Sequence, residues 1–206
     1  GSPINVSATA LRIEGTGSIG EPGRHVTTSI DQLTVLSTDG SIFITELNQV
    51  TVTHVETNVE ELSLEASTNF VRDLSQSDLS SGLNGDIVLV SDLGDLIVQD
   101  GADADGLGVV ALGSGRILLH AESGSIELAA DIRSSSGLIT IQGNQGVDFR
   151  ENILVSTEAD ISITATNGDI SMRGTSTVSA TSSTARLDAA GDIILGNINA
   201  QNVSIS

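Results

Sequence analysis

The stretch that decides the fold, residues 115–206, begins with the phrase Gly115-Arg-Ile-Leu-Leu and then repeats variations of it. In each phrase a small or acidic residue precedes a β-branched residue, a spacer and another aliphatic residue. The later versions are Gly124-Ser-Ile-Glu-Leu, Gly137-Leu-Ile-Thr-Ile, Asp160-Ile-Ser-Ile, Gly168-Asp-Ile-Ser-Met and Gly191-Asp-Ile-Ile-Leu. Apolar positions two apart behind a turn residue predict strands of four or five residues.

The spacing between the phrases predicts how these strands are arranged. Ile117, Ile139 and Ile161 follow one another at steps of 22 residues. Two further series have nearly the same period: Ile126, Val147, Ile170 and Ile193 with steps of 21, 23 and 23, and Ile132, Ile153, Val178 and Ile198 with steps of 21, 25 and 20. Three interleaved series with one period predict an all-β parallel β-solenoid, with three short strands in each coil of about 22 residues.

The composition narrows the classes of function. The net charge is −19, and all 8 basic residues are Arg, so phosphate backbones and anionic membranes are disfavoured as partners. Cys is absent, which excludes disulfides and thiolate chemistry. No apolar run approaches the 18 or so residues of a membrane-spanning helix, so we expect no membrane insertion. With no Trp or Tyr and 3 Phe, the core must be built from aliphatic side chains.

Several runs resemble a known family. They are Gly17-Ser-Ile-Gly, Thr27-Thr-Ser-Ile-Asp-Gln-Leu-Thr-Val, Gly40-Ser-Ile-Phe-Ile-Thr-Glu and, later, Leu187-Asp-Ala-Ala-Gly-Asp-Ile-Ile-Leu-Gly. They are similar to runs in filamentous haemagglutinin and related giant bacterial surface adhesins. The resemblance implies a right-handed β-helix that serves as the rod-like shaft of an exported, cell-surface protein. It also implies a protein or glycan on another cell as the partner, and it carries over no catalytic or binding residue.

Two polar interruptions, residues 67–84 and 99–108, break the rhythm. Insertions in solenoids emerge as loops on one side and often carry the binding function, so we expect loop insertions at both places. Apart from them, we expect residues 1–206 to form a single solenoid that is a fragment of a longer chain. The coil edges at its two ends predict a monomer or a weak end-to-end association.

The second interruption contains a candidate metal site. Asp100, Asp103 and Asp105, with Gly101 and Gly106 beside them, offer the hard oxygen ligands that Ca²⁺ prefers. The spacing fits neither the EF-hand loop nor the glycine-rich nonapeptide of calcium-binding β-rolls. The alternative is a solvated acidic turn, since Asp and Gly are also ordinary turn residues. Calcium is the one cofactor for which the sequence offers candidate ligands.

A second acidic group, Glu56, Glu60, Glu61 and Glu65, leaves an enzymatic alternative open. Paired carboxylates perform glycoside hydrolysis, and parallel β-helices include polysaccharide-cleaving enzymes. Such an enzyme needs aromatic platforms for sugar rings, which a chain without Trp or Tyr does not supply. We therefore expect a structural protein rather than an enzyme, with a calcium- or carbohydrate-binding module as the alternative.

Overall fold

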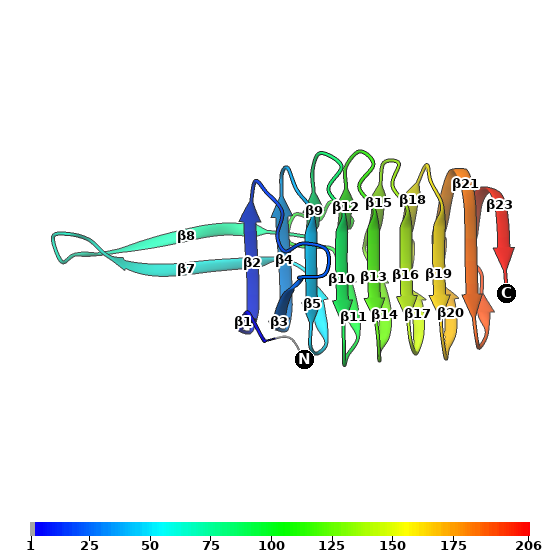
Figure 1. Cartoon of the computed structure of the whole chain (residues 1–206), viewed down its shortest axis with the longest axis horizontal. Coiled ribbons are helices and arrows are strands. Elements are labelled where there is room, and N and C mark those ends of the chain that lie inside the picture. The colour runs from blue at the N-terminus through cyan, green and yellow to red at the C-terminus, as the bar shows by residue number, and fades with distance from the viewer. Residues whose placement is uncertain (1–2) are drawn as a thin grey trace.

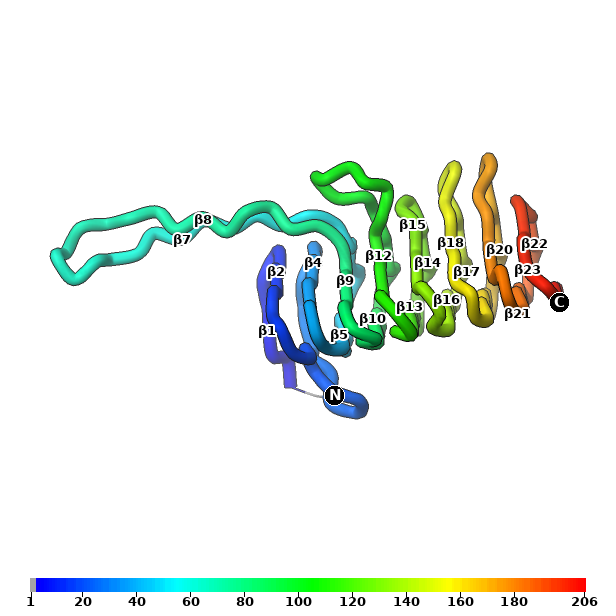
Figure 2. The backbone as a smooth tube through the Cα atoms, turned by 90° about the horizontal axis from the view of Figure 1, so that it is seen from above, coloured from blue at the N-terminus to red at the C-terminus, as the bar shows by residue number. Residues whose placement is uncertain are grey.

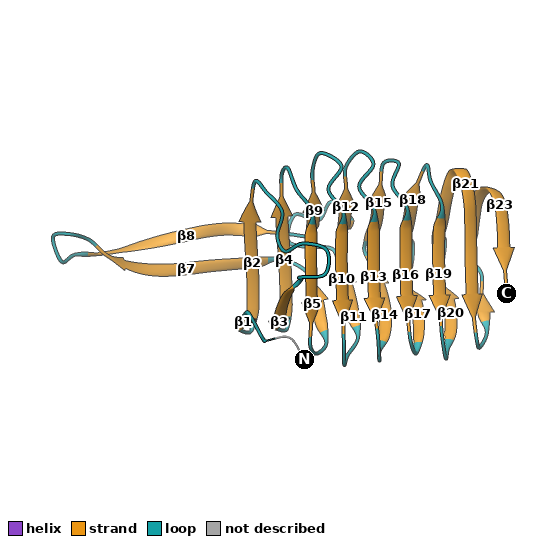
Figure 3. Cartoon of the chain, viewed as in Figure 1, coloured by secondary structure: helices purple, strands orange, loops and turns teal. Residues whose placement is uncertain are grey.

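The computed structural model describes residues 3–206, and this part of the chain is all-β (Figure 3). One sheet contains 21 strands, and its strand pairings are parallel, as in the predicted solenoid. The strands stack side by side into an elongated body, with the N-terminal coils at one end and the C-terminal coils at the other (Figure 1). Within residues 3–206 there is no helix long and apolar enough to cross a membrane.

The strands pair in columns along the long axis. One column is β1 (Val6–Ser7), β3 (Val26–Ser29), β5 (Ile42–Glu46), β10 (Ile87–Ser91), β13 (Ile117–Ala121), β16 (Ile139–Gly143) and β19 (Ile161–Ala165). A second is β6 (Val50–Val52), β11 (Leu96–Gln99), β14 (Ser125–Ala129), β17 (Gly146–Phe149), β20 (Asp169–Met172) and β22 (Ile193–Ile194).

Another column is β2 (Ala10–Gly15), β4 (Gln32–Ser37), β9 (Leu79–Ser81), β12 (Leu107–Ala111), β15 (Asp131–Ser134) and β18 (Leu154–Thr157). The long strands β21 (Thr177–Ala189) and β23 (Asn197–Ile205) bend round a corner, so each takes part in two columns. Each strand in the middle of the body therefore pairs with the strand of the coil before it and with that of the coil after it.

The registers confirm the first two of the predicted series. Ile117 pairs with Ile139 and Ile139 with Ile161, and the same ladder extends back to Ile87 and Ile42. In the second series Ile126 pairs with Val147, then Ile170 and Ile193 follow. These ladders form the core, in which most of the inward aliphatic side chains have no solvent exposure.

The third predicted series is wrong at one residue. Ile132 pairs with Val155 instead of Ile153, and Val155 then pairs with Val178. The corner between β17 and β18 has four residues, 150–153, where the corner between β14 and β15 has only Ala130. The longer corner delays the start of the strand, so the pairing resumes two residues later than equal spacing predicts.

Glycines fill corners where successive coils approach each other most closely. A Cβ atom on Gly115 would lie 2.2 Å from the carbonyl oxygen of Gly85, and a Cβ on Gly137 would lie 2.0 Å from that of Gly115. A side chain does not fit there, because Cβ atoms essentially never approach a carbonyl oxygen so closely. The glycines that precede these two strand phrases are thus required by the spacing of the coils.

Corner aspartates link each coil to the next. Asp131 Oδ1, for example, accepts a hydrogen bond of 2.8 Å from the backbone N–H of Leu154. The same arrangement joins Asp86 to Arg116, Asp95 to Ser125, Asp160 to Thr184 and Asp169 to Asp192. Each of these bonds leads from a carboxylate in one coil to an N–H group in the following coil.

The first predicted insertion differs from the structure. Residues 67–84 are not a loop: they contain β8 (Thr68–Gln76), which pairs antiparallel with β7 (Val55–Leu62), and then β9. The insertion thus begins earlier, at Val55, and is a β-hairpin, because its alternating residues pair with each other instead of with a neighbouring coil. The hairpin runs along the axis and projects beyond β1 and β2 (Figures 1 and 2). The second insertion is a loop, residues 100–106, between β11 and β12.

Candidate metal centre

The hairpin and the acidic loop leave the solenoid at the same corner of two successive coils. The hairpin connects β6 to β9, and the acidic loop connects β11 to β12. Since β9 and β12 are paired, with Leu79 opposite Val109, the end of the hairpin lies beside the acidic loop. Figure 2 shows both insertions on one side of the stack. Residues about 25 positions apart in the sequence are thereby brought together.

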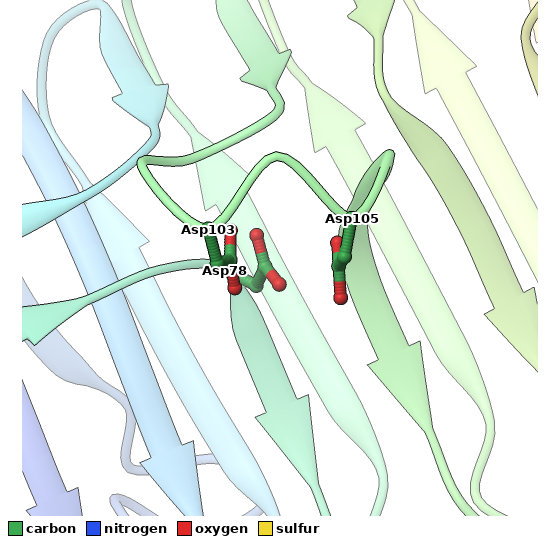
Figure 4. Close-up of side chains that lie close together, drawn as sticks. All are labelled: Asp78, Asp103 and Asp105. Carbon is green, nitrogen blue, oxygen red and sulfur yellow. The ribbon is translucent and has the colours of Figure 1, made fainter.

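Three carboxylates meet at this corner. Asp78 lies between the hairpin and β9, whereas Asp103 and Asp105 belong to the acidic loop, residues 100–106. One oxygen from each carboxylate lies within 4.8 Å of the other two. Asp78 is buried, with 8% of its surface exposed, and the other two are exposed. In the close-up the carboxyl of Asp78 lies between those of Asp103 and Asp105 (Figure 4).

The neighbouring coils hold the backbone of this cluster in place. The carbonyl of Asp78 accepts hydrogen bonds from the backbone N–H of Val35 (3.0 Å) and from the hydroxyl of Thr34 (2.9 Å). Asp78 itself has a left-handed backbone, with φ of 68°. The acidic loop is tied to the hairpin end through a bond from the N–H of Ala102 to Ser77 Oγ (3.1 Å). The cluster is therefore built on two connected pieces of backbone.

The buried carboxylate lacks a partner for one of its oxygens. Asp78 Oδ1 is buried and accepts no hydrogen bond, and Asp100 Oδ1 is in the same situation. Burial, together with the negative charges of Asp103, Asp105 and Asp100, raises the pKa of Asp78 to about 7. A cation placed among these oxygens would counteract the raised pKa of Asp78, because it would give the unpartnered oxygen a partner and offset the repulsion between the carboxylates.

The sequence predicted part of this site. The structure brings Asp103 and Asp105 together, and it places Asp100 in the same loop, close enough to raise the pKa of Asp78, although outside the group of three oxygens. Sequence reasoning missed Asp78, the only buried member. The pairing of β9 with β12 places residue 78 beside the acidic loop. The inserted hairpin interrupts the sequence period from which that pairing could have been predicted.

The hairpin presents a second candidate surface, which is apolar. Leu62 and Phe70 are 72% and 79% exposed, and Leu64 and Leu74 are also exposed. The predicted glutamate group lies here too: Glu60 is opposite Phe70, Glu61 is opposite Asn69, and Glu56 forms an ion pair with Arg72. These carboxylates thus lie on a projecting hairpin.

The fold and the cluster together define an acidic parallel β-solenoid with a projecting hairpin and an acidic corner at the root of that hairpin. Comparison with protein-family models, with curated proteins and with solved structures gave no match to this chain.

Proposed function

We propose that this chain is a rod-like structural segment of a bacterial surface-exposed or secreted adhesin-like protein. In this proposal the solenoid is right-handed and has three strands per coil. Its role is to support cell-surface or cell–cell interaction by holding a binding region at a distance from the cell. The target is a protein or glycan on another cell surface.

The observation that carries the proposal is the continuous pairing of the coils. Val35, Leu79, Val109, Ile132, Val155, Val178 and Ile198 form one unbroken ladder of paired positions. Such a body is long, and each coil stabilises its neighbours, which are the properties that a spacer needs. The interior of the coils is filled with buried aliphatic side chains, so it suits a structural role better than the binding of a ligand inside the coils.

Small-angle scattering and a surface-display assay test this proposal together. Scattering from the purified chain should give an elongated particle. For the assay, one, two or three copies are placed between a cell anchor and a domain that binds a known receptor. Capture of receptor-coated particles should increase with the number of copies, because the binding domain stands further from the cell. A compact particle, or capture that is independent of copy number, would refute the spacer role.

The two ends of the rod suit weak association between copies. Among residues 3–206, β2 pairs only with β4, and β23 pairs only with β21, so each end has a strand with a free edge. Stacking of one copy on another would continue the parallel pairing, whereas the net charge of −19 opposes it. Sedimentation velocity should therefore show a monomer at low concentration, with association that increases as salt screens the charge.

The hairpin offers the best support for the alternative, a carbohydrate-binding module. Phe70 is exposed on the hairpin, whereas Phe43 and Phe149 are buried, so it is the one exposed phenyl ring among the described residues of a chain without Trp or Tyr. A glycan array with the whole chain, repeated with Phe70→Ala, separates the two functions. Binding that is lost in the variant would favour the module, and an array without binding would favour the rod.

A further inference from the structure

We propose that Asp78, Asp103 and Asp105 bind one Ca²⁺ ion, which fastens the acidic loop to the root of the projecting hairpin. The ion would join two successive coils through side chains, at the corner where both coils carry an insertion. This inference does not depend on the role of the rod, because a spacer and a binding module could each contain such a clamp.

The unpartnered oxygen of Asp78 is the first support. Glu46, the other buried acidic residue among residues 3–206, has its donors: with no solvent exposure, it accepts bonds from the hydroxyl of Thr28 and from the N–H groups of Ile30 and Asn48. Asp78 is nearly as buried, yet its Oδ1 has no donor, and one oxygen of its carboxylate lies within 4.8 Å of oxygens of two further carboxylates. A buried anion without a donor is costly, and a bound cation is the partner that this arrangement lacks.

The geometry and the ligand types favour calcium among the divalent cations. The three oxygens lie within 4.8 Å of one another, a spacing from which small side-chain rotations bring all three to the usual Ca²⁺–oxygen distance of roughly 2.4 Å. Neither His nor Cys belongs to the group, which disfavours zinc. Asp103 and Asp105 are exposed, which leaves room for the water molecules that complete a coordination of six to eight oxygens.

The position of the site gives the ion a mechanical role. Ser77 already bonds the loop through Ala102, and Gly101 lies so close to Ser77 that a Cβ atom there would be 2.1 Å from its hydroxyl oxygen. The ion would add a second, stronger connection one residue further along the chain. It would thereby fix the end of β8, and with it the direction of the hairpin, to the coil that contains β11 and β12.

Calorimetric titration of the whole chain with CaCl₂, in the absence of other divalent ions, tests the site. We expect binding of one ion per chain with a dissociation constant at or below about 1 mM, the range of extracellular calcium modules. Asp78→Asn and the double variant Asp103→Asn/Asp105→Asn should each weaken binding at least tenfold. Asn tolerates the left-handed backbone of residue 78, so the first variant retains the fold, which circular dichroism checks.

A matched control separates a site from general attraction to an acidic protein. The double variant Asp39→Asn/Asp192→Asn removes the same charge from two exposed positions outside the acidic corner, and it should bind calcium as the wild type does. Equal weakening in both double variants, or no binding heat up to about 1 mM, would overturn the proposal.

Hydrogen exchange gives a readout of the clamp itself. Calcium should slow exchange of the amides in residues 77–79 and 100–106 of the wild type and leave them unchanged in Asp78→Asn. Binding heat without this local protection would show that calcium attaches elsewhere, and it would also refute the clamp. Neither result bears on the length or the shape of the rod.

Discussion

The coils and the hairpin both contain alternating aliphatic residues, but these residues are buried in the coils and exposed in the hairpin. In the coils, alternating aliphatic residues such as Leu119 and Ile141 have no solvent exposure, because each strand lies between two others. In the hairpin, Leu62 and Leu64 alternate in the same way and are exposed. The difference is the partner of each strand: a neighbouring coil in one case, and the other arm of a two-stranded ribbon in the other. Alternation therefore predicts a strand and does not predict what covers it.

Two Leu→Ala substitutions test this comparison with the largest expected contrast. Leu119→Ala leaves a cavity between Leu89 and Ile141 in a filled ladder, and it should lower the free energy of unfolding by about 2–5 kcal/mol. Leu62→Ala removes a side chain that is 72% exposed and should change it by about 0.5 kcal/mol or less. Urea unfolding measures both, and similar losses in the two variants would mean that the hairpin is covered in solution.

A glycine pair tests the contact between coils in the same way. Gly115→Ala places a methyl group against the carbonyl of Gly85 and should cost about 1–3 kcal/mol through overpacking. Gly17→Ala meets no atom within 4 Å and should be close to neutral. Thermal unfolding of the two variants gives the comparison. If Gly115→Ala were as stable as the wild type, the coils would not be in contact at this corner.

The acidic corner should make stability depend on pH. The folded pKa of Asp78 is about 7, above the value of roughly 3.9 for an unfolded aspartate, so the folded chain holds the extra proton between these values. The free energy of unfolding contributed by Asp78 is therefore fully present below that interval and is lost as the pH rises through it. Between about pH 5 and 7, in the absence of calcium, we expect a loss on the order of 1–2 kcal/mol.

The variant Asp78→Asn has no carboxyl at this position and should lose this dependence, while Asp39→Asn should retain it. Urea unfolding at several pH values, with a chelator present, measures the slope. An unchanged slope in Asp78→Asn would show that other groups cause it.

The smallest expected effect concerns the ion pairs on the outside of the coils. Burial alone would raise the pKa of Asp86, but the hydrogen bonds from the side chain and backbone of Arg116 outweigh it and lower that pKa. Because Arg116 is exposed, Arg116→Ala should cost no more than about 1 kcal/mol. The backbone bond from residue 116 to Asp86 remains in the variant. If Arg116→Ala lowered the free energy of unfolding by more than Gly115→Ala does, the ion pair between Asp86 and Arg116 would contribute substantially to holding the two coils together.

The sequence predicted the coils well because their register is periodic. The steps between Ile117, Ile139 and Ile161 translate directly into neighbouring strands, and the error at Ile153 arose where one corner grew to four residues. The hairpin interrupts that period and pairs with itself, so periodicity says nothing about its extent. Asp78 was missed for the same reason, since it follows the hairpin and its neighbours in space, Asp103 and Asp105, belong to the second insertion, so none of the three lies in a periodic series.

The corner aspartates have one further consequence, which is that the rod has a chemical direction. Asp131 offers its oxygen to the N–H of Leu154, and the other corner bonds lead the same way, from the earlier coil to the later one. A finished coil thus displays aspartate acceptors that match the backbone of the coil still to be added, whereas Glu46 accepts in the opposite sense, from the N–H of Ile30 in the coil before it. If the chain emerges amino end first, each earlier coil is complete before the next one is added. The coils would then assemble in one direction, from the N-terminal end to the C-terminal end.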